Sequence, residues 1–137
     1  MVDGKKISIV VPVRKGSQRV VGKNTRDFFD IEGGLTFIKI SQLVQVKNID
    51  EIIISTDDDK VKKIALLFND ERIVIDDRPE FLALSKTTTI ELINYMFSLV
   101  KTGVVVWTHT TSPFVDKNVY EDTIEKYLKN LTKYDSL

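Results

Sequence analysis

The alternation of short β-branched runs with segments of helical periodicity constrains the fold of this chain most. Four such runs predict strands, most of them buried on both faces of a sheet: residues 7–13, 52–55, 72–75 and 104–107. Apolar residues recur at helical spacing in residues 35–47, 61–68 and 90–100, and again after Asp116. This order predicts a three-layer, doubly wound, mostly parallel α/β sheet, because right-handed crossovers place helices on both faces.

We expect residues 1–137 to form a single domain that is part of a longer protein. No repeat, low-complexity segment or interdomain linker divides the sequence. Residues 134–137 have the pattern of a further strand, which would leave an unfinished sheet edge. We therefore expect the chain to be truncated at its C-terminus.

Composition excludes several classes of function. The 137 residues include 20 Lys and Arg, 20 Asp and Glu, one His and no Cys. The balanced charge argues against nucleic acid as a partner, and the missing cysteines exclude thiolate nucleophiles and cysteine-ligated zinc. The longest N-terminal apolar run, residues 7–13, is too short for a membrane span or a signal peptide. We expect a cytoplasmic protein that has no membrane partner.

The loops that follow the predicted strands are the candidate site, since ligands of such sheets bind beyond the carboxyl ends of the strands. These loops are residues 14–24, 56–59 and 109–113. The first combines glycines with Arg and Lys directly after a buried strand, which is the composition of a phosphate-binding loop. It is not a Walker loop, because Gly16 and Gly22 are one residue too far apart and Asn24 replaces the hydroxyl residue. A solvated basic loop is the alternative interpretation.

Four motifs follow one another along the chain: Pro12-x-Arg14-x-Gly16-Ser17 with Gly22-Lys23-Asn24, then Ser55-Thr56-Asp57-Asp58, then Arg78-Pro79-x-x-Leu82-Ala83, and finally Thr111-Ser112-Pro113. Together they resemble the cytidylyltransferases that activate sialic acids and related nine-carbon acid sugars. The resemblance covers most of the chain. It implies a Rossmann-like fold of the nucleotide-diphospho-sugar transferase type, and transfer of CMP from CTP to the anomeric hydroxyl of an acidic sugar with release of pyrophosphate.

The resemblance also assigns roles to residues of the first loop. Arg14 would contact the phosphates, and Lys23 would balance the charge of the triphosphate and pyrophosphate. Both are therefore the catalytic candidates, since phosphoryl transfer depends on positioning and on neutralising negative charge. Ser17 and Asn24 would hydrogen-bond the nucleotide.

Further nucleotide contacts are implied at Arg78, Thr88 and Thr89. Arg78 matches the family arginine that helps to select cytosine, and its planar donors suit base acceptors. The alternative is a surface arginine before a rigid proline turn. Thr88 and Thr89 match small hydroxyl residues near the nucleotide, and capping of the third helix is an equal and compatible interpretation.

Metal binding is the weakest of these expectations. The carboxylates of Asp57, Asp58 and Asp59 suit Mg²⁺, but a run of acids at a helix start also interacts favourably with the helix dipole, and we favour that interpretation. The resemblance implies Mg²⁺ as a cofactor, whose ligands in the family lie in a part that corresponds to positions beyond residue 137. It also implies a homodimer where the family's C-terminal subunit element is present.

Departures from the family pattern bear on the acceptor sugar. His109, the only histidine, occupies the position at which the family presents Gln to the acceptor within Gln-Pro-Thr-Ser-Pro. A neutral imidazole has one donor fewer than a carboxamide, so we expect the choice of acceptor sugar to differ from that of the family. Ser85 stands where the family usually has Asp after the Leu-Ala pair. Ahead of the loop glycine, Val13-Arg14-Lys15 stands where the family usually has a second Arg or Ala-Arg. Neither departure removes an essential charge.

Two other functions are also compatible with the sequence. One is a sugar nucleotidyltransferase of the same fold with a different base or a keto-deoxy acid as acceptor. The other is a non-catalytic nucleotide-binding domain that has lost turnover. Strong preference for CTP over UTP and GTP separates the cytidylyltransferase from an enzyme that uses a different base. CTP binding without pyrophosphate release favours the non-catalytic domain.

Overall fold

Four parallel strands form the central sheet: β1 (Ile7–Val13), β2 (Glu51–Thr56), β3 (Ile73–Asp77) and β4 (Val104–Trp107). The structure is a computed structural model that describes residues 4–16, 20–84, 86–100 and 103–137. Ser17, one of the expected nucleotide contacts, lies outside the described residues. The doubly wound parallel sheet expected from the alternation of elements is confirmed.

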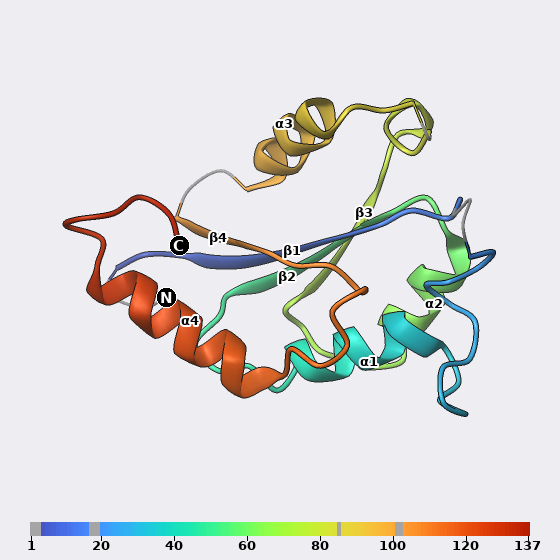
Figure 1. The fold of residues 1–137 in the computed structure, drawn as a ribbon, viewed down its shortest axis with the longest axis horizontal. Helices are drawn as coiled ribbons and strands as arrows, with labels where there is room; N and C mark the ends of the chain where they lie inside the picture. Colours follow the sequence, from blue (N-terminus) through green and yellow to red (C-terminus); the bar gives the residue numbers. More distant parts are fainter. Residues whose placement is uncertain (1–3, 17–19, 85, 101–102) are drawn as a thin grey trace.

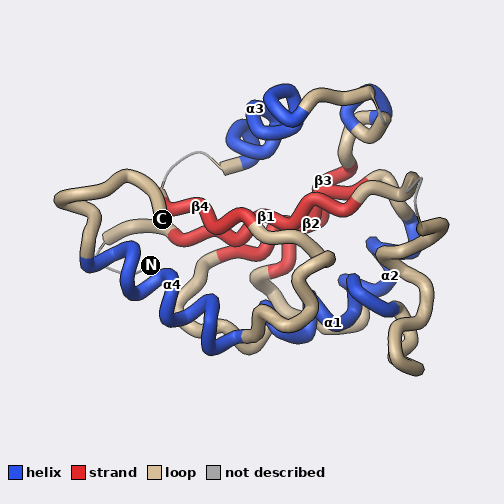
Figure 2. Tube along the Cα trace, viewed as in Figure 1, coloured by secondary structure: helices blue, strands red, loops and turns tan. Residues whose placement is uncertain are grey.

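Helices cover both faces of this sheet. They are α1 (Gly34–Leu43), α2 (Asp59–Leu66), α3 (Thr89–Leu99) and α4 (Lys117–Lys129), with a short 3₁₀ helix, η1 (Glu80–Leu82), before α3. Figure 1 shows α3 on one face of the sheet and α1, α2 and α4 on the other. Figure 2 shows the same three layers, with the strands between the two groups of helices. No helix among the described residues is long and apolar enough to cross a membrane.

Strand β1 builds both cores through the alternation of its side chains. Its odd-numbered residues, from Ile7 to Val13, pack in the core formed with α1, α2 and α4. Val10 points the other way and packs with Ile53 and with Met96 of α3. A strand with a period of two must be apolar at every position to fill both cores, which explains its nearly continuous apolar sequence.

The strand order β3-β2-β1-β4 determines where a ligand can bind. The chain runs outward from β1 through β2 to β3, and then crosses to the other side of β1 to form β4. In a doubly wound sheet such a reversal leaves a crevice at the carboxyl ends of the two strands that flank it, here β1 and β4. The crossover therefore brings the loop after Val13 next to the loop after Trp107.

Two expectations about element boundaries are wrong. The helix predicted over residues 35–47 ends at Leu43, and Val46 reaches the core through a tighter turn in which its N–H donates to the Leu43 carbonyl. The strand predicted over residues 134–137 is absent from that described segment. There the N–H of Tyr134 donates to the carbonyl of Asn130 and the Tyr127 hydroxyl donates to the carbonyl of Asp135, so the chain turns back over the end of α4.

Candidate functional site

A cavity of about 250 Å³ opens at the carboxyl ends of β1, β3 and β4 and reaches the start of α3. It collects seven of the eight residues expected at the site: Arg14, Lys23, Asn24, Arg78, Thr88, Thr89 and His109. Its other lining residues are Pro12, Gly16, Leu82, Leu84, Thr87, Leu92, Thr110 and Thr111. Three of these side chains are cationic, and no described residue that lines the cavity is acidic. The cavity therefore suits an anionic ligand.

Asn24 anchors the first loop in front of the sheet. Its side-chain amide donates to the carbonyl of Arg14 at 3.1 Å, and its Oδ1 accepts from the Thr110 hydroxyl at 2.6 Å. Its own carbonyl accepts from the Thr36 hydroxyl at 2.5 Å. Because Asn24 is buried and largely occupied by these bonds, it holds the loops after β1 and β4 together as well as lining the cavity.

The same loop is fixed at two further points. The N–H of Lys15 donates to Asp57 Oδ1 at 2.8 Å. Downstream, Gly34 has a positive φ of 55°, and a Cβ at this position would collide with the carbonyl of Arg26. Only glycine allows α1 to begin so close to the loop. These contacts place the Arg14 side chain at the cavity wall.

Arg78 is a buried arginine with only 6% of its surface exposed. Its Nη2 donates to the carbonyl of Ser55 at 3.0 Å, and no described carboxylate lies within ion-pair distance of it. Burial lowers the pKa of Arg78, while the nearby charges of Asp57 and Asp76 oppose that shift. A guanidinium held in this way favours a ligand that accepts hydrogen bonds. The alternative of a surface arginine is wrong.

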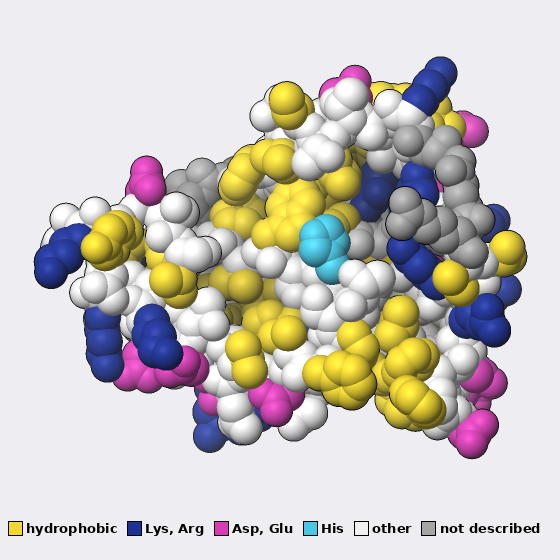
Figure 3. All heavy atoms as spheres, in the orientation of Figure 1, with side chains coloured by type: hydrophobic (Ala, Val, Ile, Leu, Met, Phe, Trp, Pro, Cys, Tyr) yellow, Lys and Arg dark blue, Asp and Glu magenta, His cyan; other side chains and the backbone are white. Residues whose placement is uncertain are grey.

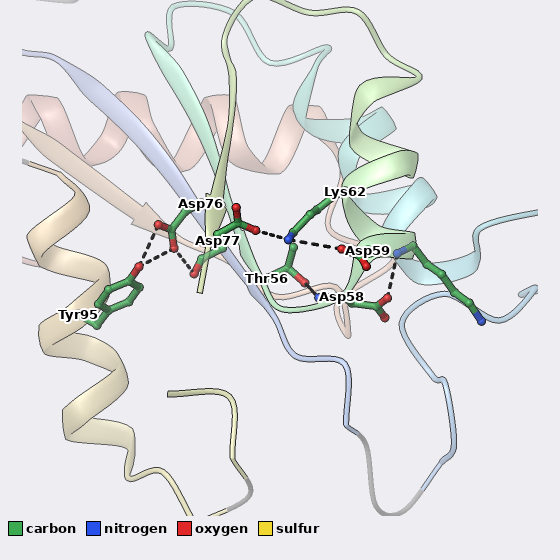
Figure 4. A network of polar contacts seen from close by, with 9 residues as sticks. Thr56, Asp58, Asp59, Lys62, Asp76, Asp77 and Tyr95 are labelled. Atoms are coloured by element: carbon green, nitrogen blue, oxygen red, sulfur yellow. Dashed lines mark hydrogen bonds and ion pairs between the residues drawn. The ribbon is translucent and has the colours of Figure 1, made fainter. Parts of the chain in front are cut away.

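Further polar contacts connect Arg78 through Ser55 to Asp76 and to Tyr95. The Ser55 hydroxyl donates to Asp76 at 2.8 Å and lies 3.4 Å from Arg78 Nε, which donates to it. The hydroxyl of Tyr95 on α3 donates to both oxygens of Asp76, as Figure 4 shows. Burial and the contact with Asp76 raise the pKa of Tyr95 to about 12, so this donor keeps its proton at neutral pH. Sequence reasoning missed Tyr95 because its position predicts only packing.

Thr88 caps α3. Its hydroxyl accepts from the N–H of Glu91 at 3.2 Å, and the Glu91 carboxylate accepts from the N–H of Thr88 at 2.7 Å, which completes a capping box. These contacts with Thr88 lower the pKa of Glu91. The capping interpretation is therefore confirmed, and Thr88 and Thr89 also line the cavity.

His109 lines the cavity beyond the end of β4. Its Nε2 accepts a hydrogen bond from the indole Nε1 of Trp107 at 2.9 Å. Partial burial lowers the pKa of His109, and the positive charge of Lys23 lowers it further. The ring is therefore neutral at pH 7. In Figure 3 the histidine side chain, in cyan, lies at the surface beside a group of apolar side chains.

Lys39 supports the last loop of the site and was not expected from the sequence. Its side chain is fully buried, and its ammonium donates to the carbonyls of Ser112 at 2.9 Å and Val115 at 3.1 Å and to the Tyr120 hydroxyl at 2.8 Å. Burial lowers its pKa to about 8. Lys39 thus ties α1 to α4 and to the loop after β4.

The three consecutive acids after β2, Asp57 to Asp59, each contact a different part of the protein. Asp58 accepts from the N–H of Lys60 and caps α2, Asp57 holds the first loop, and Asp59 pairs with Lys62, which also contacts Asp77 (Figure 4). The described residues contain no group of three potential ligands that could hold a metal ion. Each of the three carboxylates is thus engaged in a contact within the protein.

Solved structures with this fold include nucleotidyltransferases. A CMP:2-keto-3-deoxy-manno-octonic acid synthetase complexed with CTP matches with a TM-score of 0.69 at 21% identity, covering 91% of this chain and 48% of that one. A 4-diphosphocytidyl-2C-methyl-D-erythritol synthase from Anaerococcus prevotii matches with a TM-score of 0.64 at 24% identity, covering 94% of this chain and 53% of that one. The expected nucleotidyltransferase-type fold is confirmed.

Sequence comparison identifies the family. Two pseudaminic acid cytidylyltransferases from strains of Campylobacter jejuni are 23% and 22% identical over 130 residues, which is 91% of this chain and 54% of each relative. The chain therefore spans about half the length of these curated relatives. The family model described as cytidylyltransferase matches residues 8–137. The chain belongs to the cytidylyltransferase family.

Proposed function

We propose that this chain binds CTP in the cavity and transfers CMP to the anomeric hydroxyl of a sialic-acid-like nonulosonic acid, with release of pyrophosphate. One observation carries the proposal: a cavity lined by Arg14, Lys23 and Arg78, with no described acidic residue, at the switch point of a cytidylyltransferase fold. A nucleoside triphosphate and an acidic sugar are both anions, so a cationic cavity attracts both of them.

Arg14 and Lys23 supply the charge that this reaction needs. In the transfer, the anomeric oxygen bonds to the α-phosphorus, the bond from that phosphorus to the oxygen that bridges it to the β-phosphorus breaks, and the hydroxyl proton passes to solvent. Negative charge builds up on the departing pyrophosphate, and fixed cations lower the barrier by stabilising it. Hydrogen bonds with Asn24 and Asp57 fix the backbone at Arg14 and Lys15, so little reorganisation is needed there.

Arg78 is our candidate for the residue that recognises the cytosine base by hydrogen bonds. Its guanidinium is held by Ser55 on the cavity wall and offers directional donors to the acceptor atoms of cytosine. Thr88 and Thr89 contribute hydroxyl groups on the same wall. The Thr88 hydroxyl already accepts from the backbone of α3, which leaves its own proton to donate to Glu91 or to a ligand.

An acidic acceptor is supported by the names of two kinds of relative. Both pseudaminic acid and 2-keto-3-deoxy-manno-octonic acid are acid sugars. The structural match to a synthetase of the second kind favours a keto-deoxy acid as the alternative acceptor. His109 is our candidate for the residue that contacts the acceptor.

Product formation tests the proposal. The chain is incubated with CTP, Mg²⁺ and a panel of nonulosonic and keto-deoxy acids, and both pyrophosphate and CMP-sugar are measured. We expect pyrophosphate release that depends on CTP and on one acid of the panel. CTP binding without release from any acid contradicts transferase activity of this chain and favours a nucleotide-binding role.

A further inference from the structure

The contact between Trp107 and His109 determines the protonation state of the histidine. The indole Nε1 carries a hydrogen and can only donate, and it lies 2.9 Å from His109 Nε2. Nε2 must therefore offer its lone pair. A neutral imidazole with a free pair on Nε2 carries its proton on Nδ1.

The remaining ring nitrogen of His109 is therefore a donor. Among the described residues no hydrogen-bond partner is found for Nδ1, and the side chain lines the cavity. A protonated ring would lose the indole bond, because both nitrogens would then be donors. The lowered pKa of His109, caused first by burial and then by Lys23, also favours the neutral ring.

We propose that Trp107 is a positioning residue that fixes His109 as a neutral donor through Nδ1, so that His109 recognises an oxygen of the acceptor sugar and does not act as a general base. The sugar part of this proposal rests on the proposed function, whereas the tautomer does not. A base needs a free lone pair within reach of the substrate proton, and the only lone pair of this ring is taken by the indole. The site at His109 thus selects acceptors that present a hydroxyl or carbonyl oxygen.

The chain offers an unusually clean spectroscopic test, since it contains one histidine and one tryptophan. Long-range ¹H–¹⁵N correlation of the imidazole distinguishes the protonated nitrogen from the unprotonated one. At pH 7 we expect a protonated Nδ1 and an unprotonated Nε2 in the unaltered chain. A ring protonated on Nε2, or an even mixture of tautomers, overturns the proposal without any variant being made.

Trp107→Phe tests the role of the indole. Phenylalanine keeps an aromatic ring in the cluster around Met96 but has no N–H, so we expect a shift toward the Nε2-protonated tautomer. Val105→Ala is the matched control, because it removes packing from the same strand and cluster and leaves the hydrogen bond intact. The same tautomer in Trp107→Phe as in the unaltered chain overturns the positioning role.

Kinetics separate this proposal from the proposed function. With the acid sugar that is turned over, Trp107→Phe should raise the acceptor KM about three- to tenfold, the loss expected for one weakened neutral hydrogen bond, and leave CTP affinity unchanged. An unchanged acceptor KM overturns the recognition role. If no acid is turned over while the unaltered chain shows the Nδ1 tautomer, the proposed function fails and the assignment of the tautomer stands.

Discussion

At the scale of single residues, the site is defined by how its cations are held. Arg78 is buried and supported through Ser55, whereas Arg14 extends from a loop that Asn24 and Asp57 tether. A buried cation without a described ion pair is destabilising by itself. The arrangement is understandable if a ligand supplies the acceptors when it binds.

The first prediction concerns Arg14. We expect Arg14→Ala to weaken CTP binding by about 1.5–3 kcal/mol, or roughly ten- to one-hundredfold, because a charge-assisted phosphate contact is lost. Arg26→Ala is the control, since Arg26 is an exposed arginine of the same loop region that does not line the cavity. Equal affinities for the unaltered chain and Arg14→Ala would count against the phosphate contact.

The second prediction concerns His109. We expect His109→Gln to change the preference among acid sugars more than it changes the affinity for CTP, because a carboxamide offers both donors and an acceptor where the fixed imidazole offers one donor. Competition between two acid sugars, together with a CTP titration, measures both effects. Loss of CTP binding with no change in acceptor preference would show that His109 contacts the nucleotide and not the acceptor sugar.

At the scale of elements, Lys39 connects three parts of the fold. It lies on α1, and its partners belong to α4 and to the loop after β4. The loop contains Ser112, which is part of the Thr111-Ser112-Pro113 motif, and Thr111 of that motif lines the cavity. Anything that weakens this contact should therefore disturb both the packing of α4 and the acceptor side of the site.

The third prediction is a pH dependence of stability that arises from Lys39. Its pKa is lowered from 10.5 to about 8 on folding, so between these values the unfolded chain binds more protons than the folded one. The free energy of unfolding must then rise with pH in this window, by up to about 2 kcal/mol between pH 7 and pH 9.5. Above pH 10 the raised pKa values of Tyr95 and Tyr120 oppose the gain, since the unfolded tyrosines ionise first.

Urea unfolding at pH 7 and pH 9.5 measures this effect. Lys39→Met removes the titrating group while keeping a long apolar side chain, so its stability should lose the rise that the unaltered chain shows. A stability of the unaltered chain that falls over this interval would contradict the assignment, whether or not the variant folds.

Local sequence predicts much at this scale and fails where partners are distant. The cap at Thr88 follows from residue type and position alone and is confirmed, and the structure also shows side-chain caps at Asp58 and Asp116. Lys39 could not be found in this way, because its partners are 73 to 81 residues away. The contact between Trp107 and His109 could have been found, since two residues separated by one in an extended chain share a side.

At the scale of the whole molecule, topology brings the site together. The order β3-β2-β1-β4 places the loops after Val13 and Trp107 at the same end of the sheet. This explains how three of the four motifs, although far apart in the sequence, contribute residues to one cavity, while the fourth, residues 55–58, supports it from behind through Ser55 and Asp57. The alternation of strands and helices predicts that convergence, but it cannot predict that Arg78 is buried, which depends on how α3 packs through Tyr95 and Asp76.

Selectivity of the cavity for CTP can be measured by calorimetric titration with CTP, UTP, GTP and ATP in the presence of Mg²⁺. This titration requires no knowledge of the acceptor sugar. We expect CTP to bind and the other three nucleotides to bind at least tenfold more weakly, a difference of about 1.4 kcal/mol or more. Equal binding of all four nucleotides, or binding of none, would contradict selectivity for CTP.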